Sequence, residues 1–359
     1  MKKVTSSDVA KLAGVSQAAV SLILNGSEKI TFSQETRQRV FAAAQELGYK
    51  LPNRKKRSEN DLRIILVFTP TLTNSYYSEL VQHVEEYVQD WGYHVNVCNT
   101  FRNPDLERYY LENQVTSRVV GIIYSYLPSF PKLVEQISQT TPAVIIGEKQ
   151  EDFALCSVGL NNAFAGAMLL DHLYQQGHRR VAFLTTPLDQ FTLARSQRLE
   201  GIRKQMEQYG LGDNLEIIVA EQQEKDRMLQ TDLPYEYVIG RQLTRRFLAG
   251  SYRATALIAV NDMTALGIMA ELSEAGYRVP EDFSVCGFDN IFSANVTSPG
   301  LTTIEHHLRA RCHAAADMLI NPASLPHMRD RNQIGLVNKI EYTPRLMVRG
   351  STGPNKGKK

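Results

Sequence analysis

An apolar pair on the outer face of a short predicted helix is the first feature of the sequence that could recognise a ligand. Residues 16–25 predict a helix, and three positions on one side of it form a core-facing stripe: Val20, Ile23 and Leu24. Ala18 and Leu22 then lie on the opposite side, one turn apart. Such a pair stays exposed unless a binding partner covers it.

Duplex DNA is a partner that would cover this pair. Two short helices joined by a glycine-containing turn predict a helix-turn-helix motif, whose second helix lies in the major groove. Ala18 and Leu22 would then pack against thymine methyl groups, and Gln17 could bind adenine through two hydrogen bonds. We therefore expect Gln17, Ala18 and Leu22 to contact bases. A three-helix module with an isolated surface leucine is the alternative.

The charge of the chain is concentrated where this helix lies. Through Arg57 there are eleven Lys and Arg against four Asp and Glu, a net charge of +7 in a chain whose total is +2. A basic segment ahead of a mildly acidic body favours a polyanionic partner for that segment alone.

Two kinds of pattern divide the 359 residues. Residues 5–48 predict three short helices, with Gly14 ending the first and Ser16 capping the second. From Leu62 onward, short apolar strands alternate with amphipathic helices. This alternation predicts parallel sheets covered on both faces, arranged as two doubly wound halves. Ligands of such folds bind beyond the carboxyl ends of the strands.

Several classes of protein are excluded by what the sequence lacks. No apolar run is long enough to span a membrane, and the basic N-terminus is not followed by an apolar stretch, so we expect a cytoplasmic protein without a membrane partner. The four cysteines are scattered, which favours free thiols. No phosphate-binding loop, nucleophile motif or metal-ligand spacing occurs, so we expect no catalytic residues, no cofactor, no metal and no enzymatic activity.

The sequence resembles the lactose-repressor/galactose-repressor (LacI/GalR) family over nearly its whole length. The similarity is carried in order by segments that include TSSDVAKLAGVSQAAVSLILNG, ETRQRVFAAAQELGY and TALIAVNDMTALGIMAELSEAGYRVPEDFSVCGFDN. It implies an all-α helix-turn-helix head and an α/β core similar to a periplasmic sugar-binding protein. The implied activity is transcription control, as a repressor of carbohydrate-utilisation genes, by a homodimer that binds pseudo-palindromic operator DNA. A small molecule, a sugar or sugar phosphate, would change that affinity.

The resemblance also implies roles for individual residues. Gln17, Ala18 and Leu22 match base-reading positions. Positions of phosphate or sugar contact are matched by Thr5, Ser16, Ser21 and Asn25. Positions that contact the effector are matched by Tyr76, Tyr77, Ser125, Arg198, Asn261 and Asp289. Guanidinium donors and carboxylate acceptors suit a polyol.

Two departures limit this transfer. The segment YKLPNRKKRSENDL has no leucine where the family inserts one into the minor groove, so a basic linker with phosphate attraction through Arg54, Lys55 and Lys56 is favoured over an ordered helix. Gly147 occupies a position that is Asp in many relatives with sugar effectors. Glu148, which follows it, either turns inward as a substitute or points to solvent.

We therefore expect three domains: a helix-turn-helix domain at 1–48, a basic linker at 49–61 and a core at 62–359. Within the core, the first subdomain is predicted at about 62–160 plus 291–322, and the second at about 161–290 plus 323–348. Control by a protein partner instead of a sugar is the main alternative. A solute-binding protein would explain the core but not the head, and an enzyme lacks a recognisable site.

Overall fold

The structure is a computed structural model that describes residues 5–17, 19–20, 36, 39–40, 42–44, 47, 62–150, 152–188, 193–221, 233–320 and 337–355. The chain separates into two compact units, Met1–Leu62 and Arg63–Lys359.

The first unit begins with helix α1 (Ser6–Ala13). The backbone N–H and the hydroxyl of Thr5 both donate to the Asp8 carboxylate, at 2.8 and 2.7 Å, which fixes the start of the helix. Gly14 ends it in the left-handed conformation, with a φ of 64°, and its N–H bonds the carbonyl of Ala10. The predicted helix stop at Gly14 is confirmed.

A small apolar core holds this unit together. The Ser16 hydroxyl accepts a hydrogen bond from the N–H of Ala19 at 3.1 Å, so the predicted cap of the second helix is also confirmed. The buried side chains that meet here are Val9, Ala10, Ala13, Val20, Val40, Ala43 and Ala44. These residues come from all three predicted helical segments, as a packed three-helix head requires.

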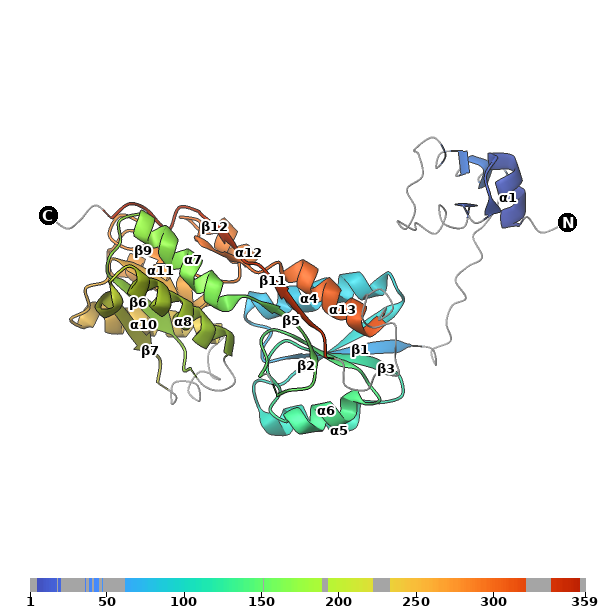
Figure 1. Ribbon diagram of the computed structural model, residues 1–359, viewed down its shortest axis with the longest axis horizontal. Coiled ribbons are helices and arrows are strands. Elements are labelled where there is room, and N and C mark those ends of the chain that lie inside the picture. Colours follow the sequence, from blue (N-terminus) through green and yellow to red (C-terminus); the bar gives the residue numbers. More distant parts are fainter. Residues whose placement is uncertain are drawn as a thin grey trace. The chain divides into compact units, whose positions relative to one another are not determined.

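The second unit contains a six-stranded parallel sheet in the order β11-β5-β4-β3-β1-β2 (Figure 1). Its strands are β1 (Arg63–Thr69), β2 (Tyr93–Asn99), β3 (Val119–Tyr124), β4 (Ala143–Ile146), β5 (Cys156–Leu160) and β11 (Lys339–Tyr342). Helices α4 (Ser75–Gln89) and α13 (Leu308–Ile320) cover one face, and α5 (Pro104–Gln114) and α6 (Pro131–Ser138) cover the other. Alternate residues of β1 pack against the two layers, so the strand is apolar on both sides.

A four-stranded parallel sheet in the order β7-β6-β8-β9 forms the other half of this unit. Its strands are β6 (Val181–Thr185), β7 (Leu215–Val219), β8 (Ala256–Ala259) and β9 (Ser284–Cys286). The surrounding helices are α7 (Asn162–Gln175), α8 (Leu193–Gln208), α10 (Tyr235–Ala249) and α11 (Asp262–Glu274), with α12 (Phe292–Val296) and the 3-10 turn η2 (Gly212–Asn214). Strands β10 (Thr303–Glu305) and β12 (Arg345–Met347) pair antiparallel beside this sheet.

The chain crosses between the two halves at different places from those predicted. Residues 323–348 were expected in the second subdomain, but β11 pairs with β5 in the first sheet. Residues 291–322 were expected in the first, but Ile291, Ala294 and Leu301 pack in the core of the second. The apolar pattern indicates that a strand exists, but it does not indicate which sheet the strand joins, because that depends on the crossovers.

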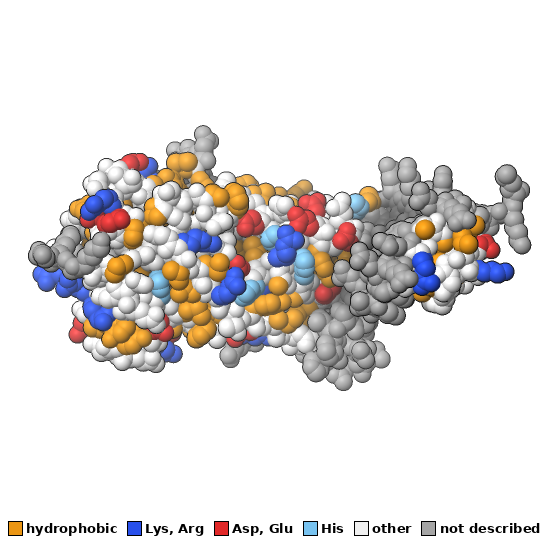
Figure 2. Space-filling view, turned by 90° about the horizontal axis from the view of Figure 1, so that it is seen from above, with side chains coloured by type: hydrophobic (Ala, Val, Ile, Leu, Met, Phe, Trp, Pro, Cys, Tyr) orange, Lys and Arg blue, Asp and Glu red, His pale blue; other side chains and the backbone are white. Residues whose placement is uncertain are grey.

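The described surface carries charges of both signs. In Figure 2, Lys and Arg side chains on the visible face lie beside Asp and Glu side chains. Arg309 and Glu86, for example, form an ion pair at 3.4 Å between α13 and α4. Every described helix is too short or too polar to cross a bilayer. The four cysteines are unpaired, as predicted, and three of them are buried.

Helix α8 is held against α7 by a close backbone contact. A Cβ at Gly201 would overlap the carbonyl of Ala163, and one at Gly166 would overlap the carbonyl of Arg198.

We expect Gly201→Ala to lower the free energy of unfolding by about 1–3 kcal/mol, because the two helices must separate. Urea denaturation measures this change. Gly212→Ala is the control, since its Cβ would meet only ordinary contacts, and equal stability of the two variants would contradict the prediction.

Candidate functional site

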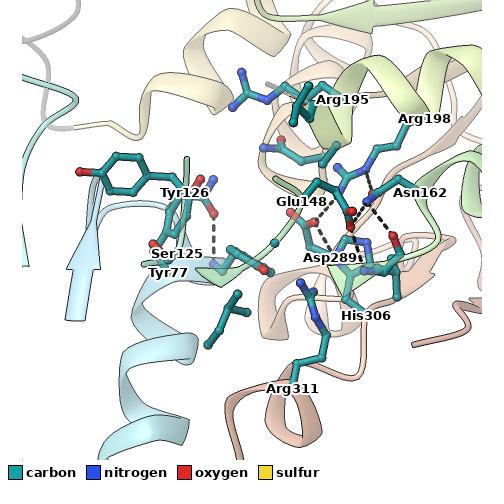
Figure 3. Close-up of a pocket in the computed structure, with 18 of the residues that line it drawn as sticks. Tyr77, Ser125, Tyr126, Glu148, Asn162, Arg195, Arg198, Asp289, His306 and Arg311 are labelled. Carbon is teal, nitrogen blue, oxygen red and sulfur yellow. Dashed lines mark hydrogen bonds and ion pairs between the residues drawn. The ribbon is translucent and has the colours of Figure 1, made fainter. Parts of the chain in front are cut away.

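A cavity lies where the carboxyl ends of strands from both sheets meet, which is the ligand position expected of doubly wound folds. The space free of protein atoms in and at the mouth of this cavity is about 780 Å³, which includes space open to solvent. Figure 3 shows Tyr77, Ser125 and Tyr126 on one side and Asn162, Asp289 and His306 on the other.

The structure brings all six residues that were matched to effector positions to this cavity. Its lining includes Tyr76 and Tyr77 at the start of α4, Ser125 after β3, Arg198 on α8, Asn261 after β8 and Asp289 after β9. Their common position does not depend on the resemblance, because each one except Arg198 follows the end of a strand.

Arg198 is the most extensively bonded of the six. The residue is 7% exposed, and its Nε donates to Asn162 Oδ1 at 3.0 Å. Nη1 donates to the carbonyl of Val260 at 2.6 Å, and Nη2 lies 3.5 Å from Asp289 Oδ1. The guanidinium also lies over the ring of Phe288, 4.6 Å from its centroid. These contacts compensate the loss of water around a buried charge.

Asp289 and His306 form the second buried group. His306 Nδ1 lies 3.3 Å from Asp289 Oδ1. Burial raises the pKa of Asp289 to about 7, against the lowering effect of Arg198. Burial, with the charges of Arg198 and Arg311, holds the pKa of His306 well below its ordinary value, so the imidazole is neutral at pH 7. Asp289 also has a φ of 117°, a strained conformation for a residue with a side chain.

Ser125 and Asn261 use part of their bonding capacity within the protein. The Ser125 hydroxyl donates to the carbonyl of Phe68 at 2.9 Å. The side-chain oxygen of Asn261 caps α11 by accepting from the N–H of Thr264 at 2.9 Å. A ligand can therefore use the lone pairs of Ser125 and the amide N–H groups of Asn261.

The two tyrosines form one wall. The rings of Tyr76 and Tyr77 meet edge to face with centroids 5.2 Å apart. Burial raises the pKa of Tyr76 to about 12 and also raises the pKa of Tyr77, so both phenols stay protonated at physiological pH.

Glu148 turns inward, which decides between the two orientations that the sequence left open. Its Oε1 accepts from the N–H of Leu160 at 2.9 Å and from the Asn162 amide at 3.1 Å. Figure 3 shows it beside Asn162 and Asp289. The cavity thus has a carboxylate from the first sheet as well as one from the second.

Sequence reasoning left Glu148 undecided and missed several polar residues of the lining, among them Arg102, Tyr126, Asn162, Arg195, His306 and Arg311. Arg102, Glu148 and Asn162 follow β2, β4 and β5, so the strand-end rule could have indicated them. Arg311 lies inside α13, where the sequence pattern gives no such signal. No group of three potential metal ligands occurs among the described residues.

The positions matched to DNA contacts are only partly described. Thr5, Ser16 and Gln17 have exposed side chains on the first unit. Ala18, Ser21, Leu22, Asn25, Arg54, Lys55 and Lys56 lie outside the described residues.

The raised pKa of Asp289 predicts a pH effect on stability. Between its unfolded pKa near 4 and its folded pKa of about 7, the folded state binds more protons, so the unfolding free energy falls as the pH rises. Asp289→Asn removes this titration. We expect the stability of the wild type relative to this variant to fall by roughly 1–4 kcal/mol from pH 4 to pH 8.

Urea denaturation across this pH range provides the test, with exposed Asp213→Asn as the control. Parallel pH profiles of the wild type and Asp289→Asn would show that the carboxyl of Asp289 ionises normally.

Comparison with known proteins found relatives that match 97% of this chain. Residues 5–53 match the family model described as bacterial regulatory proteins, lacI family, and residues 170–352 match the periplasmic binding protein-like domain. The chain is 32% identical over 355 residues to the HTH-type transcriptional repressor PurR of Mannheimia succiniciproducens, with 97% of this chain and 98% of that protein covered. It is 31% identical over 355 residues to the ribose operon repressor of Escherichia coli K12, with 97% and 99% covered.

Solved structures have the same fold. A lac repressor dimer bound to operator and the anti-inducer ONPF has a TM-score of 0.64 at 24% identity, covering 98% of this chain and all of that one. A LacI family regulator from Enterococcus faecium with bound ribose has a TM-score of 0.68 at 23% identity, covering 82% of this chain and all of that one. The chain therefore belongs to the lacI family of bacterial regulatory proteins, whose relatives here are transcriptional repressors and not enzymes.

Proposed function

We propose that the protein is a cytoplasmic repressor whose homodimer binds a pseudo-palindromic operator and responds to a carbohydrate in the cavity. The helix-turn-helix head would read the operator through Gln17, Ala18 and Leu22, with Thr5, Ser16, Ser21 and Asn25 on the DNA backbone. Two heads on one duplex double a small interface and set the spacing of the half-sites.

The cavity at the strand ends is the observation that carries the effector proposal. It offers guanidinium donors beside the carboxylates of Glu148 and Asp289, and neighbouring hydroxyl groups of a polyol can use both. Tyrosine rings supply an apolar wall for the sugar ring. Support comes from relatives: one is named a ribose operon repressor, and a structural neighbour holds bound ribose.

The domain boundaries are part of the proposal. We infer a head at 1–48, a basic linker at 49–61 and a core from 62. Within the core, we assign 291–305 to the second subdomain and β11 to the first; the packing of Ile291, Ala294 and Leu301 and the pairing of β11 with β5 support this assignment. Arg54, Lys55 and Lys56 of the linker would attract phosphates without reading sequence.

A ligand screen followed by operator binding tests the effector proposal. A bound sugar should add about 2.7 kcal/mol to stability at a concentration of roughly 100 times its Kd. It should also change operator affinity about 5- to 150-fold, the usual range of coupling between two sites. We expect Arg198→Gln to abolish that response while free operator binding persists.

Lys204→Gln on the exposed face of the same helix should respond as the wild type does. Thermal unfolding of both variants separates lost binding from lost folding. If no small molecule binds, and a protein from the host changes operator affinity instead, the carbohydrate proposal is wrong.

A second pair of variants separates base reading from backbone attraction. Lys55→Gln with Lys56→Gln should weaken binding to all DNA sequences alike, and it should reduce the slope of log affinity against log salt by about 2.

Leu22→Glu should instead change which operator is preferred, at about 1–3 kcal/mol per misread base pair. Fluorescence anisotropy on cognate and random duplexes measures both effects. A Leu22→Glu protein with unchanged operator choice would contradict the proposed recognition helix.

A further inference from the structure

Three arginines of the cavity lack a carboxylate partner in the described part of the chain. Arg198 pairs with Asp289 at 3.5 Å, but Arg102, Arg195 and Arg311 have no described carboxylate oxygen within 4.0 Å. Elsewhere in the core some arginines have a carboxylate partner, as Arg245 has in Glu271 at 2.7 Å, and others, such as Arg180 and Arg246, bond backbone carbonyls. Guanidinium groups that face an enclosed space without a counter-charge indicate that the ligand supplies one.

Two of these arginines come from opposite halves of the core. Arg102 follows β2 of the first sheet, and Arg195 lies in the first turn of α8 on the second. Arg195 Nη1 donates to the Thr186 hydroxyl at 2.5 Å, and Arg102 lies 5.9 Å from the centroid of the Tyr126 ring. In Figure 3, Arg195 reaches toward the side of the cavity where Tyr126 lies. Two like charges therefore approach from both sides of the cavity.

The electrostatics agree with this geometry. Burial and the charge of Arg102 lower the pKa of Arg195. The charge of Glu236 acts in the opposite direction but offsets this lowering only in part, and no oxygen of Glu236 lies within 4.0 Å of the guanidinium. Both cations also act on the Tyr77 phenol: burial raises its pKa, and the charges of Arg102 and Arg195 each act to lower it. The Tyr77 hydroxyl has no described hydrogen-bond partner, so its proton can be donated to a ligand.

The remaining polar groups suit a different part of the ligand. Glu148 and Asp289 lie together on the side opposite to Tyr77 and Tyr126 in Figure 3. Only Oε1 of Glu148 bonds to described residues, which leaves Oε2 for a hydroxyl donor. Glu148 and Asp289 thus accept hydroxyl hydrogens beside Arg198, whereas Arg102 and Arg195 present cations with no described carboxylate oxygen within 4.0 Å.

We propose that the effector is a sugar with one anionic substituent, a phosphate ester or a carboxylate, held between Arg102 and Arg195 and by the Tyr77 hydroxyl. This inference rests on the proposed effector function of the same cavity and adds the charge of the ligand. An anion between the two guanidinium groups replaces their mutual repulsion by two attractions, one to each half of the core.

Matched neutral and anionic probes test the charge. Isothermal titration calorimetry on the full-length protein compares D-ribose with D-ribose 5-phosphate, and D-glucose with D-glucose 6-phosphate and D-gluconate. The phosphate esters and gluconate separate the two anionic chemistries. For at least one pair, we expect the anionic member to bind at least about tenfold more tightly, as charge-assisted bonds to arginine allow, and added salt should reduce this preference.

Arg102→Gln and Arg195→Gln should each reduce the ratio of anionic to neutral affinity at least about tenfold. Arg108→Gln, an exposed arginine of the first subdomain, is the matched control and should keep the ratio. Thermal unfolding confirms that each variant is folded. The ratio of anionic to neutral affinity is also measured for the double variant Arg102→Gln with Arg195→Gln. This variant lacks both charges, so the repulsion between them cannot disturb its fold.

The outcomes separate this inference from the function on which it rests. A neutral sugar that changes operator affinity, with a Kd that neither arginine variant alters, overturns the anionic subsite and leaves the effector function intact. An anionic ligand whose preference disappears in the variants supports the subsite, even if operator affinity does not change and the effector function fails. Binding of no probe, or equal binding of each pair, counts against the subsite.

Discussion

The buried guanidinium of Arg198 is the interaction on which the arrangement of the cavity depends. Its three nitrogens bond to Asn162, Val260 and Asp289, which follow β5, β8 and β9. Removing one partner would leave a charge without water or compensation, so the three strand ends must stay in register with α8. The cost of burying this charge therefore fixes the geometry of the site.

The position of α8 is set independently of that charge. Gly166 and Gly201 allow the backbones of α7 and α8 to touch, so the helix that carries Arg198 has little freedom to slide. Packing thus supplies the position of the guanidinium, and the polar network supplies its orientation. Both are needed, because an arginine side chain with four rotatable bonds loses considerable entropy when it is held in one conformation.

The sequence predicted the elements much better than their connections. Apolar runs such as LRIILVF and TALIAVND became β1 and β8, because a strand buried on both faces must be apolar throughout. The edge strand β11, with the sequence KIEY and alternating exposure, was missed because only one of its sides is shielded. The six expected cavity residues came from family resemblance, and the strand-end rule explains why all of them except Arg198, which lies on α8, meet at one cavity. Arg311 could not be predicted, since only the packing of α13 beside β5 brings its Nη2 to the carbonyl of Val158.

The crossovers explain why a ligand in this cavity can act on the whole core. The chain passes between the halves at Asn161, at His306–His307 and at Thr343–Pro344, and these segments bond to one another. The N–H of Asn161 donates to Tyr342, and the ring of His307 lies 3.1 Å from the carbonyl of Thr343. Cavity residues lie at or next to these segments, so a ligand that contacts both halves changes the forces across a narrow covalent hinge. Such a ligand would shift the angle between the halves only as far as it bound one angle better than another, and Arg102 and Arg195, on opposite halves, are groups that it could contact.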